Sequence, residues 1–353
     1  MSISKFVGLD GMRGIAAIFI FIRHTGEYWG SFEFFHSYLA VDIFFILSGF
    51  VIAHAYENRF EEKSMATSKF IVIRLIRLYP MYFLGVLLGI ALIIIKSSHG
   101  IKTFGVEQDF LIPVVLFSLL FLPANVQSGQ PLFPLNGASW SLFYELLVNC
   151  VYAVIRKFLG LGTLLIILIV TGSILAYCSY KVGNLDIGVM GGSKSIFAAT
   201  IRAHFGIFFG LFLHKIYLKG YRTPKILDMQ LLPILIMSAI FTVPHLGIYN
   251  WLFDIITVAF ILPYCILWIA TTESNQRLIK PYLFVGMISY PLYILHGPLK
   301  EFGDLFFRDV IVAAQPLSGI AFLVAILAGC WIVVRYLDEP IRARLNRIFV
   351  KKT

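Results

Sequence analysis

The sequence predicts an all-α protein, a polytopic membrane bundle of about ten transmembrane helices with both termini in the cytoplasm. Three observations support this prediction. Of the 353 residues, 59% are hydrophobic and only 14% are charged, whereas soluble domains carry about a quarter charged residues. Apolar runs of about 20 residues, the length that crosses a bilayer as a helix, recur along the whole chain. Lys and Arg gather in the short stretches between those runs, as they do on the cytoplasmic side of membrane proteins.

Eleven apolar segments are candidates for membrane helices. They are 8–28, 37–56, 78–96, 109–123, 139–157, 161–180, 197–217, 230–244, 250–271, 282–303 and 316–336. Helices are expected because an open strand in lipid leaves its backbone groups without hydrogen-bond partners. Since no polar block as large as a soluble domain separates these segments, residues 1–353 form a single predicted domain.

The basic residues determine the predicted orientation. They cluster after the second, fifth, seventh and ninth segments and in the C-terminal tail, which includes Arg342. Placing all of these in the cytoplasm puts both termini inside, which requires an even number of crossings. The segment 109–123 is short, contains Pro113 and ends at Pro123. We therefore expect a re-entrant or partial helix there, which leaves ten crossings.

The net charge of +10 does not indicate a nucleic-acid partner. A phosphate backbone is bound by basic residues on a polar face, whereas the basic residues here lie in short stretches between apolar runs. Four cysteines, Cys150, Cys178, Cys265 and Cys330, lie in or beside apolar runs without CxxC or metal-ligand spacing. We therefore expect packing residues at these positions and no metal site.

The first two apolar segments carry ionisable residues at comparable depth. Arg13 lies in the first turn and His24 eleven residues later, about 16 Å further along a helix. Asp42 lies near the start of the next segment, which runs in the opposite direction, so it is expected beside His24. A carboxylate next to an imidazole prepares a general base, and we predict His24 and Asp42 as catalytic. The alternatives are an interfacial histidine and an acid at a helix start.

The run FIVIRLIRLYPMY at residues 70–82 carries a second polar cluster. Arg74 and Arg77 are three residues apart, so they share one helix face, at the cytoplasmic mouth just before the third segment. Paired guanidinium groups suit phosphate oxygens. We predict a donor-binding site that contains Arg74, Arg77 and Tyr79, together with Arg13. A positive-inside anchor is the alternative.

A third cluster, NGASWSLFYELLVN at 136–149, enters the fifth segment from the outer side. Ser141 and Glu145 are four residues apart and face the same way, and Trp140 adds an aromatic face that suits a sugar ring. We predict these three residues as candidates for binding the acceptor or an oxyanion. An interfacial aromatic belt would have a similar composition.

The fourth cluster is ISYPLYILHGPL at 288–299. His296 lies toward the outer half of the tenth segment, either as a polar contact in a cavity or as a packed interfacial histidine. Ser289 and Tyr290 are further candidates for the acceptor or oxyanion site. Pro298 is expected to distort the helix and to free backbone groups.

In combination and in order, these runs resemble the acyltransferase-3 family of integral membrane acyltransferases. The resemblance spans essentially the whole chain and is carried by LDGMRGIAAIFIFIRH, VDIFFILSGFVI, RLIRLYP, SWSLFYE, ISYPLYILH and a closing LDEP at 337–340. It implies ten membrane helices and O-acylation of carbohydrates, commonly acetylation from acetyl-CoA, in lipopolysaccharide, exopolysaccharide, Nod factor or antibiotic modification. It also implies an essential His24 with Arg13 as its motif partner, and a donor-binding role for Arg74 and Arg77.

Some members of that family carry a fused extracytoplasmic esterase-like (SGNH) domain. Because this chain stops at Thr353, shortly after its last apolar segment, we expect the stand-alone form. The resemblance further implies a multi-pass protein of a bacterial inner membrane.

These observations together predict a membrane O-acetyltransferase that moves an acetyl or other short acyl group from cytoplasmic acyl-CoA to a hydroxyl of an extracytoplasmic carbohydrate. Acyl-CoA is a co-substrate here, and no bound cofactor is expected. His24, oriented by Asp42, would remove the proton of the acceptor hydroxyl, and a route through an acyl-histidine stays open. A lipid-linked glycan would meet the bundle from the membrane plane. The alternative class is a proton-coupled exporter of a small acid or acylated sugar.

Overall fold

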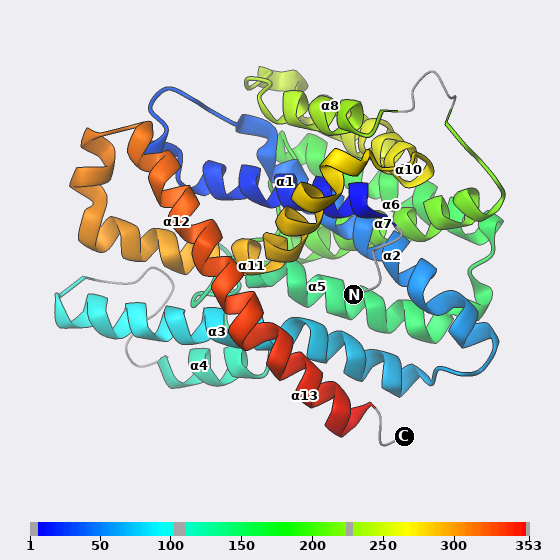
Figure 1. Ribbon diagram of the computed structural model, residues 1–353, viewed down its shortest axis with the longest axis horizontal. Helices are drawn as coiled ribbons and strands as arrows, with labels where there is room; N and C mark the ends of the chain where they lie inside the picture. Colours follow the sequence, from blue (N-terminus) through cyan, green and yellow to red (C-terminus); the bar gives the residue numbers. More distant parts are fainter. Residues whose placement is uncertain (1–5, 102–110, 224–228, 351–353) are drawn as a thin grey trace.

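The computed structural model describes residues 6–101, 111–223 and 229–350, which form a bundle of helices (Figure 1). The α-helices are α1 (Val7–His24), α2 (Ala40–Glu61), α3 (Thr67–Ser98), α4 (Leu111–Leu119), α5 (Ser139–Ile155), α6 (Leu161–Val182), α7 (Ser193–Leu218), α8 (Leu231–Phe241), α9 (Asn250–Ile256), α10 (Leu262–Thr271), α11 (Gln276–Ala313), α12 (Leu317–Val333) and α13 (Glu339–Phe349). π-helical turns join α9 to α10 (η7, Thr257–Ile261) and α12 to α13 (η8, Val334–Asp338). Among the described residues, β pairing is limited to one isolated bridge between Pro131 and Met190, so the predicted all-α class is confirmed.

Within the described ranges, seven helical stretches are long and apolar enough to cross a membrane. They are Phe35–Glu61, Thr67–Ser98, Leu161–Val182, Ser193–Leu218, Gly247–Thr271, Gln276–Ala313 and Leu317–Phe349. The chain is therefore a multi-pass membrane protein by the length and composition of its helices. The total of ten crossings and the cytoplasmic position of both termini stay predictions.

Two of the expected segments form short helices. In 109–123 the helix is α4, which has nine residues, or about 13 Å of helix against a hydrocarbon layer of about 30 Å. Residues 109 and 110 lie outside the described residues, and α4 begins at the first residue described after them, so the re-entrant or partial helix stays a prediction. In 230–244 the helix is α8, which has eleven residues and falls short of a full crossing for the same reason.

The third segment begins earlier than predicted. The sequence places its start at 78, but α3 begins at Thr67 and continues through Pro80 to Ser98. Arg74 and Arg77 therefore lie inside a helix, and the prediction that they precede it is wrong. The basic residues of this run lowered its local hydropathy, and the helix tolerates them because their side chains face a polar cavity described below.

Helix α1 packs closely along α11. A Cβ atom at Gly14 would lie 2.5 Å from Val285, and one at Gly286 would lie 2.6 Å from Asp10. Glycine at these positions lets the two backbones approach, as small residues do at helix crossings in membranes. This close packing holds Arg13 of α1 directly against α11.

Three prolines lie inside α11, which nevertheless continues over 38 residues. Pro298 has no N–H to donate to the carbonyl four residues before it, that of Ile294. The side-chain amide of Asn136 donates to this carbonyl instead, at 2.7 Å. The freed backbone group that the sequence predicts is thus present, and it ties α11 to the start of α5.

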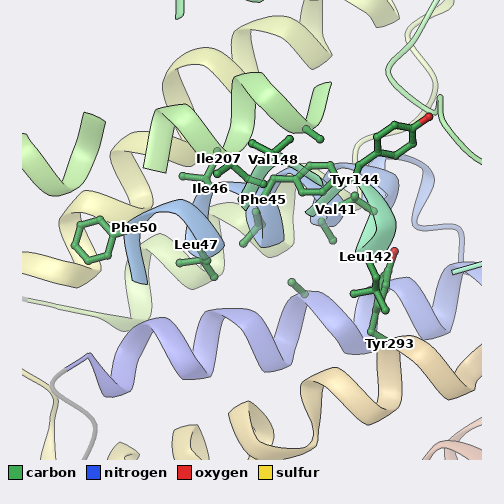
Figure 2. Close-up of a cluster of buried hydrophobic side chains, with 14 of the residues drawn as sticks. Val41, Phe45, Ile46, Leu47, Phe50, Leu142, Tyr144, Val148, Ile207 and Tyr293 are labelled. Carbon is green, nitrogen blue, oxygen red and sulfur yellow. The ribbon is translucent and has the colours of Figure 1, made fainter. Parts of the chain in front are cut away.

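Helix α2 is enclosed by apolar side chains of α5 and α7. Figure 2 shows Phe45 and Ile46 of α2 beside Val148 of α5 and Ile207 of α7, with Phe50 further along α2. All five side chains are buried. The packing is close because glycines of α2 and α7 face the opposite backbone.

We expect Gly49→Val to destabilise the folded protein by about 1–3 kcal/mol. A Cβ atom at Gly49 would collide with the backbone carbonyl of Ile207, so α2 and α7 would have to separate. Gly329→Val is the matched control, because Gly329 is also helical and a Cβ there meets open space. Thermal unfolding in detergent measures both variants, and equal midpoints would contradict this packing.

Candidate functional site

A cavity of about 550 Å³ lies between α1, α2, α3, α5 and α11. This volume is in the range of small-molecule binding sites. Seven of the predicted site residues line it: Arg13, Arg74, Arg77, Ser141, Glu145, Ser289 and Tyr290. Residues from four separate runs of the sequence therefore meet around one space.

Arg13 is held at the cavity wall by groups of α1 and α11. Its Nε donates to the hydroxyl of Ser289 at 2.9 Å, and its Nη2 donates to the carbonyl of Gly286 at 2.9 Å. Nη2 also lies 3.1 Å from Asp10, one turn earlier in α1. Ser289, predicted as an acceptor or oxyanion candidate, is therefore a positioning partner of Arg13.

Arg74 and Glu145 form an ion pair inside the bundle. The carboxylate of Glu145 accepts from Arg74 and also, at 2.6 Å, from the hydroxyl of Ser48. Arg74 is seven residues into α3 and Glu145 six residues into α5. The sequence assigned these residues to opposite mouths of the bundle, and this assignment is wrong, because side chains in contact share one depth.

Arg77 lines the same cavity without a partner. Among the described residues it forms no hydrogen bond or ion pair, in contrast to Arg13 and Arg74. A guanidinium group in such a setting is available to an anionic ligand. The cavity therefore holds three arginines, of which one is uncommitted.

Tyr290 is already engaged by the protein. Its hydroxyl donates to the carbonyl of Leu78 at 2.5 Å, which joins α11 to α3. Its proton is therefore not directed toward a ligand. Ser141 is better placed for such a role, because its hydroxyl shares a hydrogen bond of 2.6 Å with the hydroxyl of Tyr293 at the cavity wall.

Tyr293 connects the cavity to two histidines. Its ring lies 6.0 Å from that of His296, and the ring of His296 lies 4.6 Å from that of His24 (centroid to centroid). His296 is buried, whereas His24, at the end of α1, is exposed. The sequence reading missed Tyr293, because a tyrosine in an aromatic run carries no charge to mark it.

The hydrogen bond of His24 determines which nitrogen can act as a base. Nδ1 lies 2.8 Å from the carbonyl oxygen of Ile20. Because a carbonyl only accepts, the neutral ring carries its proton on Nδ1 and leaves Nε2 as a proton acceptor. The backbone carbonyl of Ile20 thus sets the tautomer of His24, a role that the sequence analysis gave to the carboxylate of Asp42.

Asp42 does not orient His24, and the predicted pair is wrong. Its two carboxylate oxygens accept from Nε and Nη2 of Arg202 of α7, at 2.9 and 2.6 Å, and both side chains are only 1% exposed. A buried carboxylate requires a charge partner, and Arg202 supplies it across the α2–α7 contact. Arg202 lies inside the apolar run 197–217, thirteen residues before Lys215 at the end of the run, and this position is a signal that could have revealed the pair.

Two other predicted residues lie away from the cavity. The hydroxyl of Tyr79 donates to the carbonyl of Leu119 in α4 at 2.8 Å, so it is not directed toward a donor in the cavity. Trp140 is buried against Phe45, and the guanidinium carbon of Arg202 lies 5.8 Å from its ring. Neither side chain is among those that line the cavity.

The described part of the chain holds no group of three His, Cys, Asp or Glu side chains that could bind a metal ion. The four cysteines are present as free thiols. Around the cavity lie three arginines, the carboxylates of Asp10 and Glu145, the ring of His54 and several hydroxyls. His24 and His296 lie beyond Tyr293.

A family model described as an acyltransferase domain matches residues 6–335. The chain is 42% identical over 161 residues to a protein of Rhizobium radiobacter named "Protein 2 in picA locus", a match that covers 42% of this chain and 81% of that protein. It is 27% identical over 331 residues to a protein of Staphylococcus aureus strain COL named "Putative O-acetyltransferase", covering 86% of this chain and 52% of the relative.

It is also 24% identical over 377 residues to "Putative peptidoglycan O-acetyltransferase YrhL" of Bacillus subtilis strain 168, covering 98% of this chain and 56% of the relative. The chain thus spans about half the length of these two acetyltransferases. No solved structure matches it significantly.

Proposed function

The chain belongs to the acyltransferase-3 family, and on this premise we propose that it transfers an acetyl group from acetyl-CoA to a hydroxyl of a glycan across the membrane. The observation that carries the proposal is the arrangement of the cavity. Arginines line it, and Tyr293 in its wall lies beside the pair formed by His24 and His296. The cavity would be the donor site, and His24, which lies beyond Tyr293 and His296, would be the base.

The arginines account for donor binding. Acyl-CoA carries phosphates at one end and a thioester at the other, and it cannot cross a bilayer. Arg77, with no hydrogen bond or ion pair among the described residues, would bind phosphate oxygens. Arg13 and Arg74 line the same cavity, paired with Asp10 and Glu145. The pantetheine arm would extend through the cavity toward Ser141 and Tyr293.

Nε2 of His24 would remove the proton of the acceptor hydroxyl as its oxygen attacks the thioester carbonyl. The C–O bond forms, the C–S bond breaks, and the coenzyme leaves as a thiolate that takes up a proton. The intermediate oxyanion needs hydrogen-bond donors. The hydroxyls of Ser141 and Tyr293 are the nearest candidates, because Tyr293 also lies beside His296.

The acceptor would be an extracytoplasmic glycan of a bacterial envelope. His24 is exposed at the end of α1, where a large substrate can reach it. The name of the Bacillus subtilis relative makes peptidoglycan the first glycan to test. Nothing in the site favours lipopolysaccharide over other glycans, and we locate the enzyme in the cytoplasmic membrane, where acetyl-CoA and envelope glycans meet opposite faces.

The test is acetyl transfer by purified protein in lipid nanodiscs, with acetyl-CoA labelled on the acetyl group and peptidoglycan fragments as acceptor. We expect saturable acetyl-CoA binding, release of free coenzyme A and a base-labile acetyl ester on the sugar. A heat-inactivated sample measures background hydrolysis. If the protein does not bind acetyl-CoA at millimolar concentration, the donor site is refuted and the proton-coupled exporter becomes the hypothesis to test, by uptake of labelled acetate into proteoliposomes.

A further inference from the structure

A second cavity, of about 250 Å³, lies between α3 and α13. Figure 1 shows α13 lying across α3 at the C-terminal end of the chain. The cavity is lined by Ile73 and Arg77 of α3 and by Glu339, Arg342 and Asn346 of α13. The α3 residues are four apart and the α13 residues are three and four apart, so each helix presents one face to the cavity.

The cavity contains positive charge that the protein leaves incompletely paired. Nη2 of Arg342 lies 2.7 Å from Asp338, but Nε of Arg342 is buried without a hydrogen-bond partner. Arg77, on the opposite wall, has no hydrogen bond or ion pair in the described residues. Glu339 also lines the cavity, but its carboxylate accepts from Arg335 at 3.2 Å. A buried donor without an acceptor is costly, and an anionic ligand would supply the acceptor that Nε of Arg342 lacks. Oδ1 of Asp338 is likewise buried without a hydrogen-bond partner.

Arg77 belongs to both cavities. A ligand with an anionic end between α3 and α13 could therefore extend past Arg77 into the larger cavity. A molecule with phosphates at one end and a flexible, uncharged arm at the other could occupy both spaces. This is the chemistry of the thioester donor.

We infer that Arg342, Arg77 and Asn346 form a subsite for the phosphorylated nucleotide end of the acyl donor. The inference rests on the proposed function, which does not itself involve α13. Arg77 and Nε of Arg342 would donate to phosphate oxygens, and the amide of Asn346 would add a neutral donor and acceptor. Phosphate is thus bound by helix α13 as well as by α3.

The closing motif LDEP at 337–340 contains the residue that positions Arg342. Its Asp338 lies in the π-helical turn η8 and pairs with Arg342 four residues later. Asp338 is only 3% exposed, so the ion pair holds the guanidinium in a fixed place. Asp338 is therefore a positioning residue for Arg342.

The inference is tested with Arg342→Gln in nanodiscs, by measuring the Kd of acetyl-CoA, 3′-dephospho-acetyl-CoA and acetyl-pantetheine. We expect about a tenfold to hundredfold loss of acetyl-CoA affinity, the range for a charge-assisted hydrogen bond, and no change for acetyl-pantetheine, which lacks the nucleotide. Arg344→Gln is the matched control, because Arg344 is on the same helix, exposed and outside the cavity. It should bind all three compounds as the wild type does.

Several results would overturn the inference. Equal acetyl-CoA affinity in Arg342→Gln and wild type would refute the subsite and leave the proposed function intact. An equal loss for acetyl-CoA and acetyl-pantetheine would show a structural effect without phosphate recognition. If Arg342→Gln binds acetyl-CoA normally but retains less phosphatidylglycerol on purification, the cavity holds a lipid phosphate instead. Failure of the wild type itself to bind acetyl-CoA would refute both this inference and the proposed function.

Arg342→Gln leaves the buried carboxylate of Asp338 without its partner, which could disturb folding. The double variant Asp338→Asn/Arg342→Gln removes both charges and separates the two effects. We expect it to unfold at the same temperature as the wild type and to bind acetyl-CoA as weakly as the single variant. Recovery of wild-type affinity in the double variant would refute the phosphate contact.

Discussion

Replacing His24 with alanine is expected to lower the rate of acetyl transfer by about 10²–10⁴-fold, the contribution typical of a general base. Acetyl-CoA binding should persist, because His24 is not among the residues that line the donor cavity. The expected loss is in kcat, since His24 is the exposed member of the histidine pair. Nδ1 of His296 likewise lies 2.6 Å from a backbone carbonyl oxygen, that of Tyr293, but the His296 side chain is buried. Initial rates of ester formation and a separate titration of acetyl-CoA binding measure the two effects.

His99→Ala is the matched control for this prediction. His99 lies at the end of α3 and is exposed. Its Nδ1 lies 2.9 Å from the carbonyl oxygen of Ile95, four residues earlier, as Nδ1 of His24 lies near that of Ile20. The two variants remove the same side chain and the same kind of hydrogen bond. If His24→Ala retains the wild-type rate, or if its loss of rate follows a parallel loss of donor binding, His24 is not the base.

Asp42→Leu is expected to destabilise the protein by about 3–5 kcal/mol, because it leaves the guanidinium of Arg202 buried without a counter-charge. The two side chains are each 1% exposed, so water cannot replace the lost partner. Thermal unfolding in detergent should show a large fall in the midpoint. The double variant Asp42→Leu/Arg202→Met should recover most of the stability, since a buried ion pair replaced by apolar side chains is often neutral or stabilising.

The double variant also decides whether Asp42 has a catalytic role. We expect it to transfer acetyl groups at a rate close to that of the wild type per folded molecule, because neither residue lines the cavity or contacts His24 in the described residues. A folded double variant that loses transfer by about 10²-fold or more would restore Asp42 to the chemistry. It would also contradict the conclusion that the carbonyl of Ile20, and not Asp42, sets the tautomer of His24.

Much of the site could be predicted from the sequence because intramembrane polar residues are rare and therefore conspicuous. Arg13, Arg74, Arg77, Ser141 and Glu145 were found in this way, and they share one cavity. Residues without such a signal were missed. Tyr293 is one hydroxyl among many aromatic side chains, and Arg342 was counted only among the basic residues of the tail.

The errors concern which residues pair with which. Hydropathy and helical periodicity depend on residues that are close in the sequence. They could therefore predict local features: the all-α class, the multi-pass bundle and the helix face shared by Arg74 and Arg77. Arg202 lies 160 residues from Asp42 in the sequence, and no local pattern specifies that distance. Depth estimates placed Asp42 beside His24 because both lie near helix ends of adjacent segments.

The sequence by itself therefore determined the class of fold, the membrane setting and many of the polar residues that line the candidate site. Only the tertiary structure decided their partners: Asp42 pairs with Arg202 and Glu145 with Arg74, whereas Arg77 has no hydrogen bond or ion pair among the described residues. The physical reason is that a partner depends on the rotation and tilt of each helix about its neighbours. Those quantities are set by side-chain packing, such as the glycine contacts between α1 and α11 and between α2 and α7, and packing joins residues that are far apart along the chain.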